Sequence, residues 1–324
     1  MKAAIIEKLG ETPKYKDFPN PKIQSEEHLV IDMKAAAVKN LDKIRASGKH
    51  YASYKKLPTV VGMDGVGILE NGTRVYAKGI TGMIAEKAII DRNKYTLIPE
   101  NLDFNTAAAL PNAVLGAAIS LKIRGEIKKG QNVLINGATG VTGQIAVQIA
   151  KHYGAKTIIA TGRNQENLEN TKRLGAHEII SLKQKDEAII TQLKKIHSVT
   201  PIDLVIDYLW GNPIKLVIDA IKGGGLHNFT HKTRIVTVGS MAGENIQLES
   251  GILRSSAIEI LGSGFGSLSE GDLEYYDKQI LPEMFQLAAN GHLTIDVVLG
   301  SLKNIERLWE QKIDSGKRLV ITIK

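Results

Sequence analysis

Six short apolar runs, each followed by a helical pattern, occupy the chain from about residue 130 onward. The runs read NVLIN, KTIIAT, HEIISL, DLVIDYL, RIVTVGS and AIEILGSG. Short runs rich in Ile and Val, separated by amphipathic segments, are typical of strands that are buried on both faces of a parallel sheet. The alternation therefore predicts an α/β unit built on a doubly wound parallel six-stranded sheet.

A glycine-rich turn follows the first of these runs, in the stretch INGATGVTGQIAVQIAK, with glycines at 137, 140 and 143. A strand, a tight glycine turn and the start of a helix form the context in which a dinucleotide-binding loop works. Glycine lets backbone N–H groups approach a pyrophosphate closely, and the helix N-terminus adds its dipole and unpaired donors. A purely structural turn is the alternative. The cofactor-binding residues predicted in this loop are Thr139, Gly140, Val141 and Thr142.

The end of the second run indicates which dinucleotide binds. About twenty residues after the glycine loop, an NAD-binding unit usually carries an acidic residue for the ribose hydroxyls. The residues found here are Thr161, Gly162, Arg163 and Asn164. A guanidinium can pair with a 2′-phosphate that a carboxylate would repel, so Arg163 favours NADPH over NADH. The alternative is that Arg163 is a solvated loop residue.

Composition excludes several classes of protein. The chain has no cysteine, which excludes disulfides, thiolate zinc sites and a cysteine nucleophile. The net charge is +8, but the lysines are spread along the chain without interleaved aromatic residues, so nucleic-acid binding is not expected. No stretch approaches the roughly 18 unbroken apolar residues of a membrane span. We expect a cytoplasmic protein without membrane contact or a metal site; a site built from dispersed His and carboxylates is the alternative.

The first third of the chain has a different texture, with short β-rich runs such as KAAII, HLVIDMKAAAV and GMIAEKAII. Gly and Asn-Gly turns separate these runs, which predicts a compact β-barrel-like unit. After the sixth apolar run, the chain returns to mixed segments and ends in the strand-like RLVITI. The predicted divisions are residues 1–117 and 266–324 for the barrel-like domain and 118–265 for the nucleotide-binding domain.

Further stretches along nearly the whole chain carry a family resemblance. They include AAAVKNLDKIRASGKHY, LPTVVGMDGVGILE, LIPENLDFNTAAALP, the glycine-loop stretch and DLVIDYLWG. With these the chain resembles the medium-chain dehydrogenase/reductase superfamily, specifically its zinc-independent quinone oxidoreductase branch. The resemblance implies a GroES-like β-barrel substrate domain and a Rossmann nucleotide-binding domain. It also implies a homodimer that transfers hydride from NADPH to a quinone or an α,β-unsaturated carbonyl compound.

Departures from the zinc-dependent relatives define the implied chemistry. Those relatives carry an early Cys and a His-Glu pair in a Gly-His-Glu-x-x-Gly stretch. Here Asn40 stands near the first position, and GMDGVG places Met63 and Asp64 at the second. Without such ligands no Lewis acid polarises an alcohol oxygen, so the resemblance implies metal-free reduction of an activated double bond or quinone. The glycine loop also departs, because Val141 replaces a glycine of the relatives, and Gly116 stands where they often place a Thr.

The resemblance also implies site residues beyond the glycine loop. In quinone and enoyl reductases of this superfamily an Asn and a Tyr face the nicotinamide, and Asn40 and Tyr51 match them, with Tyr54 as the second choice. A phenol can donate a hydrogen bond to a carbonyl oxygen on which negative charge develops; Tyr51 as a surface residue is the alternative. The residues expected to line the nicotinamide are Gly239, Ser240, Gly262, Ser263 and Gly264.

Other functions stay open from the sequence. A 2-enoyl thioester reductase is a variant within the enzyme class, and a non-enzymatic NADPH- or RNA-binding member of the family is an alternative outside it. GATGVTG also resembles short-chain reductases of the NmrA-like branch, and Tyr51 and Lys55 match their Tyr-x-x-x-Lys pair. In those enzymes the glycine loop precedes the pair, whereas here the order is reversed.

Overall fold

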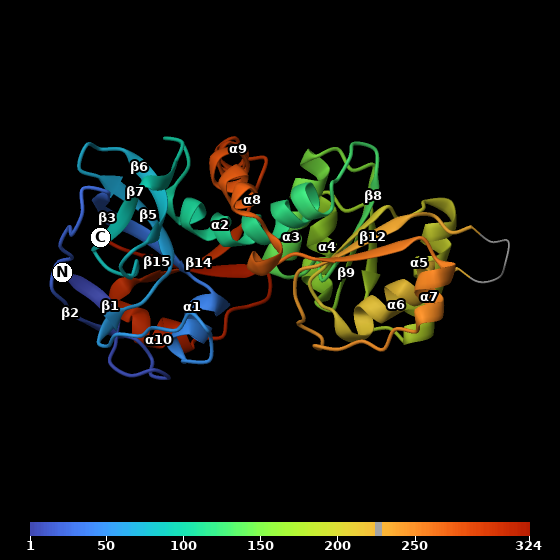
Figure 1. Cartoon of the computed structure of the whole chain (residues 1–324), viewed down its shortest axis with the longest axis horizontal. Coiled ribbons are helices and arrows are strands. Elements are labelled where there is room, and N and C mark those ends of the chain that lie inside the picture. Colours follow the sequence, from blue (N-terminus) through green and yellow to red (C-terminus); the bar gives the residue numbers. More distant parts are fainter. Residues whose placement is uncertain (224–228) are drawn as a thin grey trace. The chain divides into compact units, whose positions relative to one another are not determined.

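The computed structural model describes residues 1–223 and 229–324 and divides the chain into two compact units (Figure 1). Unit 1 comprises Met1–Asn112 and Tyr275–Lys324, and unit 2 comprises Ala113–Glu274. These divisions lie five residues before the 117/118 boundary and nine residues after the 265/266 boundary expected from the sequence. Both lie inside helices, in α2 (Phe104–Ala118) and α8 (Glu270–Tyr275), so neither coincides with the end of an element.

Unit 1 is built around an antiparallel sheet that closes on itself. The strand β3 pairs with β5 along one edge and with β7 along the other, while β6 joins β5 to β7. The sheet continues through β15 and β14, and a separate sheet has the order β2-β1-β4. The predicted β-barrel is thereby confirmed. The strands are β1 (Lys2–Ile6), β2 (Lys14–Asp17), β3 (His28–Val38), β4 (Thr59–Val60), β5 (Asp64–Leu69), β6 (Arg74–Gly79), β7 (Lys87–Leu97), β14 (Asp296–Ser301) and β15 (Lys317–Thr322).

Short helices complete unit 1, and apolar side chains fill its barrel. Ile31, Met33, Val75 and Ile90 contribute from the strands, and Trp309 contributes from the helix that precedes β15. The helical segments of this unit besides α2 are α1 (Asn40–Ala46), the π-helical turn η3 (Tyr276–Ile280), α9 (Leu281–Ala289), the 3₁₀ turn η4 (Leu302–Asn304) and α10 (Ile305–Glu310). The segment YASYK is irregular, as its sequence predicted.

Unit 2 is organised on six parallel strands in the order β10-β9-β8-β11-β12-β13. All six predicted strands are present, and the predicted doubly wound parallel sheet is confirmed. The chain starts at β8, runs outward to β10, returns to β11 beside β8 and runs outward to β13. The strands are β8 (Asn132–Asn136), β9 (Thr157–Gly162), β10 (Glu178–Ser181), β11 (Leu204–Asp207), β12 (Thr233–Thr237) and β13 (Ile258–Gly262).

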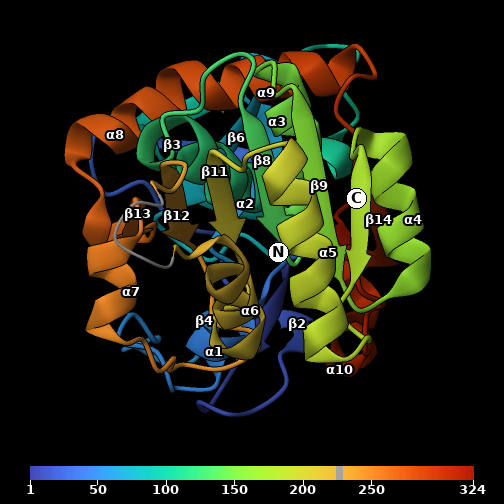
Figure 2. The ribbon, with the colours of Figure 1, turned by 90° about the vertical axis from the view of Figure 1, so that its right-hand side faces the viewer.

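Helices cover both faces of this sheet (Figure 2). On one face, α5 and α6 pack on the alternate strand residues Leu134, Ile159, Val205 and Ile235. The residues between them point to the other face, toward α3 and α4, which fits the two-residue period of a strand. The helical segments are η1 (Ile119–Arg124), α3 (Val141–His152), α4 (Gln165–Leu174), α5 (Asp186–Val199), α6 (Gly211–Ile221), α7 (Ser250–Ser255) and η2 (Phe265–Ser267).

The reversal of strand order between β8 and β11 determines where a ligand can bind. In open α/β sheets, the loops after two neighbouring strands diverge at such a point and leave a crevice at the carboxyl ends. The glycine loop follows β8, and the DYLWG turn follows β11. These two loops therefore lie side by side at the switch point.

One segment, Phe104–Arg124, is long and apolar enough to cross a membrane by length and composition. Its most apolar window is 67% buried inside the protein. Burial of this kind is typical of a core helix.

Candidate functional site

The three glycines of the loop after β8 have different structural roles. Gly137 has a φ of +94°, and a Cβ there would lie 3.0 Å from the Leu209 side chain. At Gly143 a Cβ would lie 2.3 Å from the Gly137 carbonyl oxygen, so only glycine allows α3 to start this close to the strand. A Cβ at Gly140 would meet only that same oxygen, 4.0 Å away. Two glycines thus shape the turn, and the third faces open space.

The N-terminus of α3 presents unpaired donors at this open position. Gly140 is its N-cap and has no side-chain cap, and the first turn carries no acidic residue. The first intrahelical bond is donated by the Gln144 N–H to the Gly140 carbonyl over 2.9 Å. The N–H groups without an acceptor inside the helix are those of Val141, Thr142 and Gly143. Together with the helix dipole they form an environment that favours an anion.

The end of β9 lies beside the glycine loop and carries Arg163. This side chain is exposed and makes no hydrogen bond or ion pair with any other described residue. Asn164 caps α4 by accepting the Asn167 N–H over 2.9 Å. Asn167 in turn donates its side-chain amide to the Thr139 carbonyl over 3.3 Å. These bonds fix the start of α4 against the glycine loop and leave the guanidinium of Arg163 available to a ligand.

The other two predicted residues of β9 pack against the loop. A Cβ on Gly162 would lie 2.2 Å from the Thr139 methyl group, so Thr139 rests directly on this glycine. Thr161 is fully buried, and its hydroxyl donates to Asn136 Oδ1 over 2.6 Å. Thr161 therefore lies beneath the loop, and its hydroxyl does not face the surface.

A second cation stands beside Arg163 that the sequence reasoning missed. Ser181 pairs with Gly162, and the Leu182 N–H donates to the Gly162 carbonyl over 2.8 Å. The next residue is the exposed Lys183, so the parallel register brings this lysine alongside the segment that holds Arg163. The available signal was the LKQK run that follows the third apolar run.

The predicted nicotinamide-lining residues follow β12 and β13 at the same edge of the sheet. They are Gly239, Ser240, Gly262, Ser263 and Gly264. The Ser240 hydroxyl donates to Glu244 over 2.7 Å, and the Ser263 N–H donates to the Thr237 carbonyl over 2.8 Å. The carboxyl ends of β8, β9, β12 and β13 thus bring all the cofactor residues predicted in unit 2 to one edge.

A buried carboxylate lies under this edge. Asp207 accepts the Asn136 side-chain amide over 2.7 Å, the Leu209 N–H over 3.2 Å and the Trp210 N–H over 3.0 Å. Burial raises the pKa of Asp207 to about 6, against the hydrogen bonds that lower it. No sequence pattern indicated this residue, because DLVIDYL reads as an ordinary strand.

In unit 1, the substrate-facing candidates lie at the surface. Tyr51 is 87% exposed, with its ring 4.2 Å from the His50 ring, and Asn40 is the exposed first residue of α1. Tyr54 is partly buried, and its hydroxyl accepts the Gly62 N–H over 3.1 Å. The hydroxyl of Tyr54 is therefore engaged, whereas that of Tyr51 has no partner in the described part of the chain.

The positions compared with the zinc-dependent relatives hold a buried ion-pair cluster. Lys39 Nζ lies 2.7 Å from Asp64 Oδ1 and 3.1 Å from Asp42 Oδ2, and all three side chains are buried. Burial disfavours the charged amine, but the two carboxylates outweigh it and raise the pKa of Lys39. Asp42 also accepts the Met63 N–H over 3.0 Å. The side chain that faces Asp64 is thus Lys39, and the neighbouring Asn40 named from the sequence points to solvent.

A guanidinium lies close to this cluster. Burial lowers the pKa of Arg318, while the charges of Asp64 and Asp42 oppose that shift. Its side chain donates to Asn112 Oδ1 over 3.4 Å. The cluster therefore contains two cations and two carboxylates.

No group of three or more His, Asp or Glu side chains that could hold a metal ion occurs within 1–223 and 229–324. His231 lies four residues after His227, a spacing that metal sites use, but His227 lies outside the described residues. His231 Nε2 is 2.8 Å from Asp203 Oδ1.

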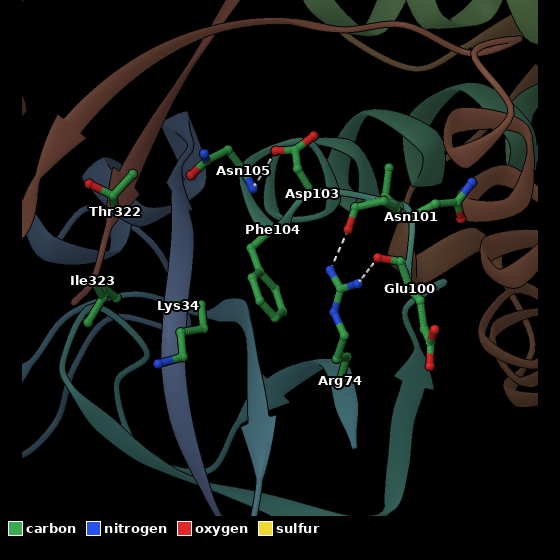
Figure 3. Close-up of a pocket in the computed structure, with 10 residues that line it drawn as sticks. Lys34, Arg74, Glu100, Asn101, Asp103, Phe104, Asn105, Thr322 and Ile323 are labelled. Carbon is green, nitrogen blue, oxygen red and sulfur yellow. Dashed lines mark hydrogen bonds between the residues drawn. The ribbon is translucent and has the colours of Figure 1, made fainter. Parts of the chain in front are cut away.

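A surface pocket of about 530 Å³ in unit 1 contains none of the predicted site residues (Figure 3). Arg74 lies across it and donates to the carbonyls of Pro99, Glu100 and Leu102, while the Phe104 ring lies 4.3 Å from its guanidinium carbon. These contacts occupy the guanidinium and anchor the loop before α2. Arg74 therefore has a structural role in this pocket.

Comparisons with known proteins agree with this geometry. A family described as zinc-binding dehydrogenase matches residues 141–283. The chain is 37% identical over 172 residues to the chloroplastic NADPH-dependent alkenal/one oxidoreductase of Arabidopsis thaliana, a match that covers 47% of this chain and 44% of that protein. It is 28% identical over 248 residues to the quinone oxidoreductase of Sus scrofa, with 73% and 72% of the two chains covered.

Solved structures show the same fold over the full length. The quinone oxidoreductase of Thermus thermophilus, whose complex with NADPH is also known, superposes with a TM-score of 0.76 at 24% identity and covers 100% of both chains. In the short-chain reductases considered as an alternative, the glycine loop precedes the Tyr-Lys pair, whereas here a β-barrel domain precedes the glycine loop. The chain therefore has the fold of the quinone oxidoreductases, and its sequence is similar to theirs over about three quarters of its length.

Proposed function

We propose that this protein is an NADPH-dependent oxidoreductase that reduces a quinone or an α,β-unsaturated carbonyl compound. The observation that carries the proposal is the uncapped N-terminus of α3 behind an open glycine, at the switch point of a parallel sheet. The names of the relatives support it, since the plant relative is an NADPH-dependent alkenal/one oxidoreductase and the pig relative a quinone oxidoreductase.

The residues of unit 2 fit a bound NADPH. The first N–H groups of α3 would hold the pyrophosphate, because they lack acceptors within the helix. Arg163 would pair with the 2′-phosphate, and Lys183 would add a second positive charge beside it. The residues that would line the nicotinamide are Gly239, Ser240, Gly262, Ser263 and Gly264. When bound, NADPH supplies the hydride.

In unit 1, Tyr51 and Asn40 are the candidates for binding the substrate. The hydroxyl of Tyr51 is exposed and can donate to a carbonyl oxygen, which stabilises negative charge that develops there. Asn40 can orient the same oxygen through its amide. Tyr54 is the weaker candidate, because its hydroxyl already accepts the Gly62 N–H.

The reduction we propose needs no metal. The chain has no cysteine, and Asp64, at a position compared with a zinc-ligating pair, is bonded to Lys39 instead. A metal at this position would have to displace a buried ammonium from two carboxylates. This arrangement supports reduction without a Lewis acid.

The proposal is tested by following NADPH oxidation in the presence of a benzoquinone, a short-chain enone and a 2-enoyl thioester. We expect turnover with the quinone or the enone, and faster turnover with NADPH than with NADH. Turnover only with the thioester would establish the alternative enoyl reductase. Tight binding of NADPH without turnover of any substrate would contradict the enzyme and favour a binding protein.

We also propose a cytoplasmic homodimer. Its support is β13, which ends the order of the six-stranded sheet and leaves one edge of backbone groups open to a second copy. Light scattering on the purified chain tests the assembly, and a monomeric mass would contradict it.

A further inference from the structure

We propose that Asp207, Asn136 and Thr161 form a buried positioning relay that fixes the conformation in which the glycine loop binds its dinucleotide. The identity of that dinucleotide rests on the function proposed above. None of the three side chains touches the cofactor edge directly, because all three are fully buried. Their effect on binding is exerted through the backbone of the loop.

The relay is a continuous chain of hydrogen bonds across three strands. From β11, Asp207 accepts the Asn136 amide of β8 over 2.7 Å. Asn136 Oδ1 then accepts the Thr161 hydroxyl of β9 over 2.6 Å. The Thr161 hydroxyl oxygen finally accepts the N–H of Gly137 over 3.3 Å, and the Thr161 carbonyl shares that N–H over 3.2 Å. The last acceptor thus reaches the first residue of the glycine loop.

Every donor in this relay, the backbone N–H of Gly137 included, points toward the carboxylate. The Gly137 N–H donates to Thr161, the Thr161 O–H donates to Asn136, and the Asn136 N–H donates to Asp207. Because a carboxylate only accepts, the orientation of the Asn136 amide follows from its contact with Asp207. Aligned bonds in a medium of low dielectric strengthen one another, so the charge of Asp207 reinforces the bond at Gly137.

The same carboxylate fixes the neighbouring turn at the switch point. Its oxygens accept the N–H groups of Leu209 and Trp210, and Trp210 has the unusual φ of +54°. The Leu209 side chain in turn lies 3.0 Å from the position that a Cβ on Gly137 would take. Asp207 therefore acts on Gly137 in two ways. Through Asn136 and Thr161 it supports the hydrogen bond of the Gly137 N–H, and through the turn at Leu209 it positions the side chain that packs near Gly137.

Packing of the sheet alone does not account for this relay. A buried carboxylate without a cation is costly, as the raised pKa of Asp207 shows, and apolar side chains of similar volume would fill the same space without that cost. The donors that Asp207 accepts from lie at the end of β8 and in the turn after β11, which meet at the switch point. We infer that the chain retains the carboxylate because it sets the geometry of these loops.

The test compares Thr161→Val with Thr233→Val, a matched control. Both threonines are fully buried and lie on strands of the same sheet, and the Thr233 hydroxyl also donates one hydrogen bond, to the Ile202 carbonyl over 2.7 Å. That bond lies at the amino ends of the strands, away from the glycine loop. Both variants and Asp207→Asn are titrated with NADPH and with adenosine 2′-phosphate, which lacks the pyrophosphate.

We expect Thr161→Val to raise the Kd for NADPH by about fivefold and Asp207→Asn by about tenfold, whereas Thr233→Val leaves it unchanged. The Kd for adenosine 2′-phosphate should stay the same in all three. The double variant Thr161→Val/Asp207→Asn should lose less than the product of the two single effects, because both act on one chain of bonds. Equal NADPH affinity in Thr161→Val and the control, or equal weakening of both ligands, would overturn the relay.

Amide hydrogen exchange separates this inference from the proposed function. If the wild-type chain does not bind NADPH, the proposed function fails, and exchange at Gly137 and Ala138 still tests the relay. Thr161→Val should speed exchange at these amides relative to Thr233→Val. Unchanged exchange would overturn the relay whatever the cofactor.

Discussion

Each unit of the molecule buries carboxylates, but the two units compensate their charge differently. In unit 1, Asp42 and Asp64 are paired with the ammonium of Lys39, and the guanidinium of Arg318 lies close by. In unit 2, Asp207 has no cation and is held by neutral N–H donors. The carboxylates of unit 1 thus belong to an ion-pair cluster within the barrel domain, whereas the carboxylate of unit 2 is an unpaired charge beneath the glycine loop.

The pKa directions express this difference. The two carboxylates raise the pKa of Lys39 in spite of its burial, so the ion-pair cluster favours its own charges. Burial raises the pKa of Asp207 to about 6, so the fold disfavours that charge. Removing the charge of Lys39 should therefore destabilise unit 1, whereas removing the charge of Asp207 should stabilise unit 2.

Lys39→Met should have the largest effect on stability. It removes the cation that contacts both Asp42 and Asp64 and leaves the guanidinium of Arg318 as the remaining positive charge of the cluster, and breaking a buried pair in this way costs about 3–5 kcal/mol. The free energy of unfolding, measured by urea denaturation, should fall by that amount. The control is Lys87→Met, which removes an exposed ammonium 2.6 Å from Asp32 and should cost less than about 1 kcal/mol. Equal losses in the two variants would show that the cluster is not a stabilising ion pair.

The pH dependence of stability tests the lone carboxylate. Burial raises the pKa of Asp207 from its ordinary value of 3.8 to about 6 in the folded chain, so the folded state holds the proton more tightly. The resulting stabilisation is complete below pH 3.8 and is lost as the pH rises through 6, a change of about 3 kcal/mol. We expect the difference in unfolding free energy between the wild type and Asp207→Asn to change by most of this amount between about pH 4 and about pH 7. A difference independent of pH would contradict the burial of an ionisable Asp207.

Most of the fold follows from local sequence patterns. The six runs of unit 2 form six strands because each is short, rich in Ile and Val, and followed by an amphipathic helix. The barrel followed from alternating runs and Asn-Gly turns. The division between the two units is harder to predict, because it falls inside α2 and just before the last residue of α8. A division inside a helix depends on tertiary contacts, which local sequence patterns do not encode.

The candidate site was only partly predictable, for the same reason. The glycine loop and Arg163 stand in contiguous motifs whose chemistry can be read directly. Lys183 required the register of β9 and β10, and the relay required β8, β9 and β11 side by side. A sequence comparison drew attention to Asn40, whereas the burial of the residue before it, Lys39, appears only in the folded barrel.

Arg163→Leu extends the comparison to a charge at the surface. This guanidinium is exposed, so its loss should leave the free energy of unfolding within about 0.5 kcal/mol of the wild type. The KM for NADPH should rise about tenfold, since a charge-assisted bond to the 2′-phosphate is lost, and the KM for NADH should not change. Lys183→Met should raise the KM for NADPH less, by about threefold. An equal rise for both cofactors would show that these cations do not recognise the 2′-phosphate.

A chelator should have the smallest effect, and it tests whether the ion-pair cluster of unit 1 takes the place of a metal. Asp64 is bonded to Lys39, and the chain has no cysteine to add a thiolate ligand. We therefore expect quinone reduction to proceed at an unchanged rate after incubation with EDTA or phenanthroline. A zinc-dependent alcohol dehydrogenase treated in parallel is the control, because it should lose activity under the same conditions. Loss of activity that added Zn²⁺ restores would show that a metal displaces Lys39. The carboxylates of unit 1 would then be compensated by a bound metal ion instead of a lysine, and the comparison with Asp207 would have to be revised.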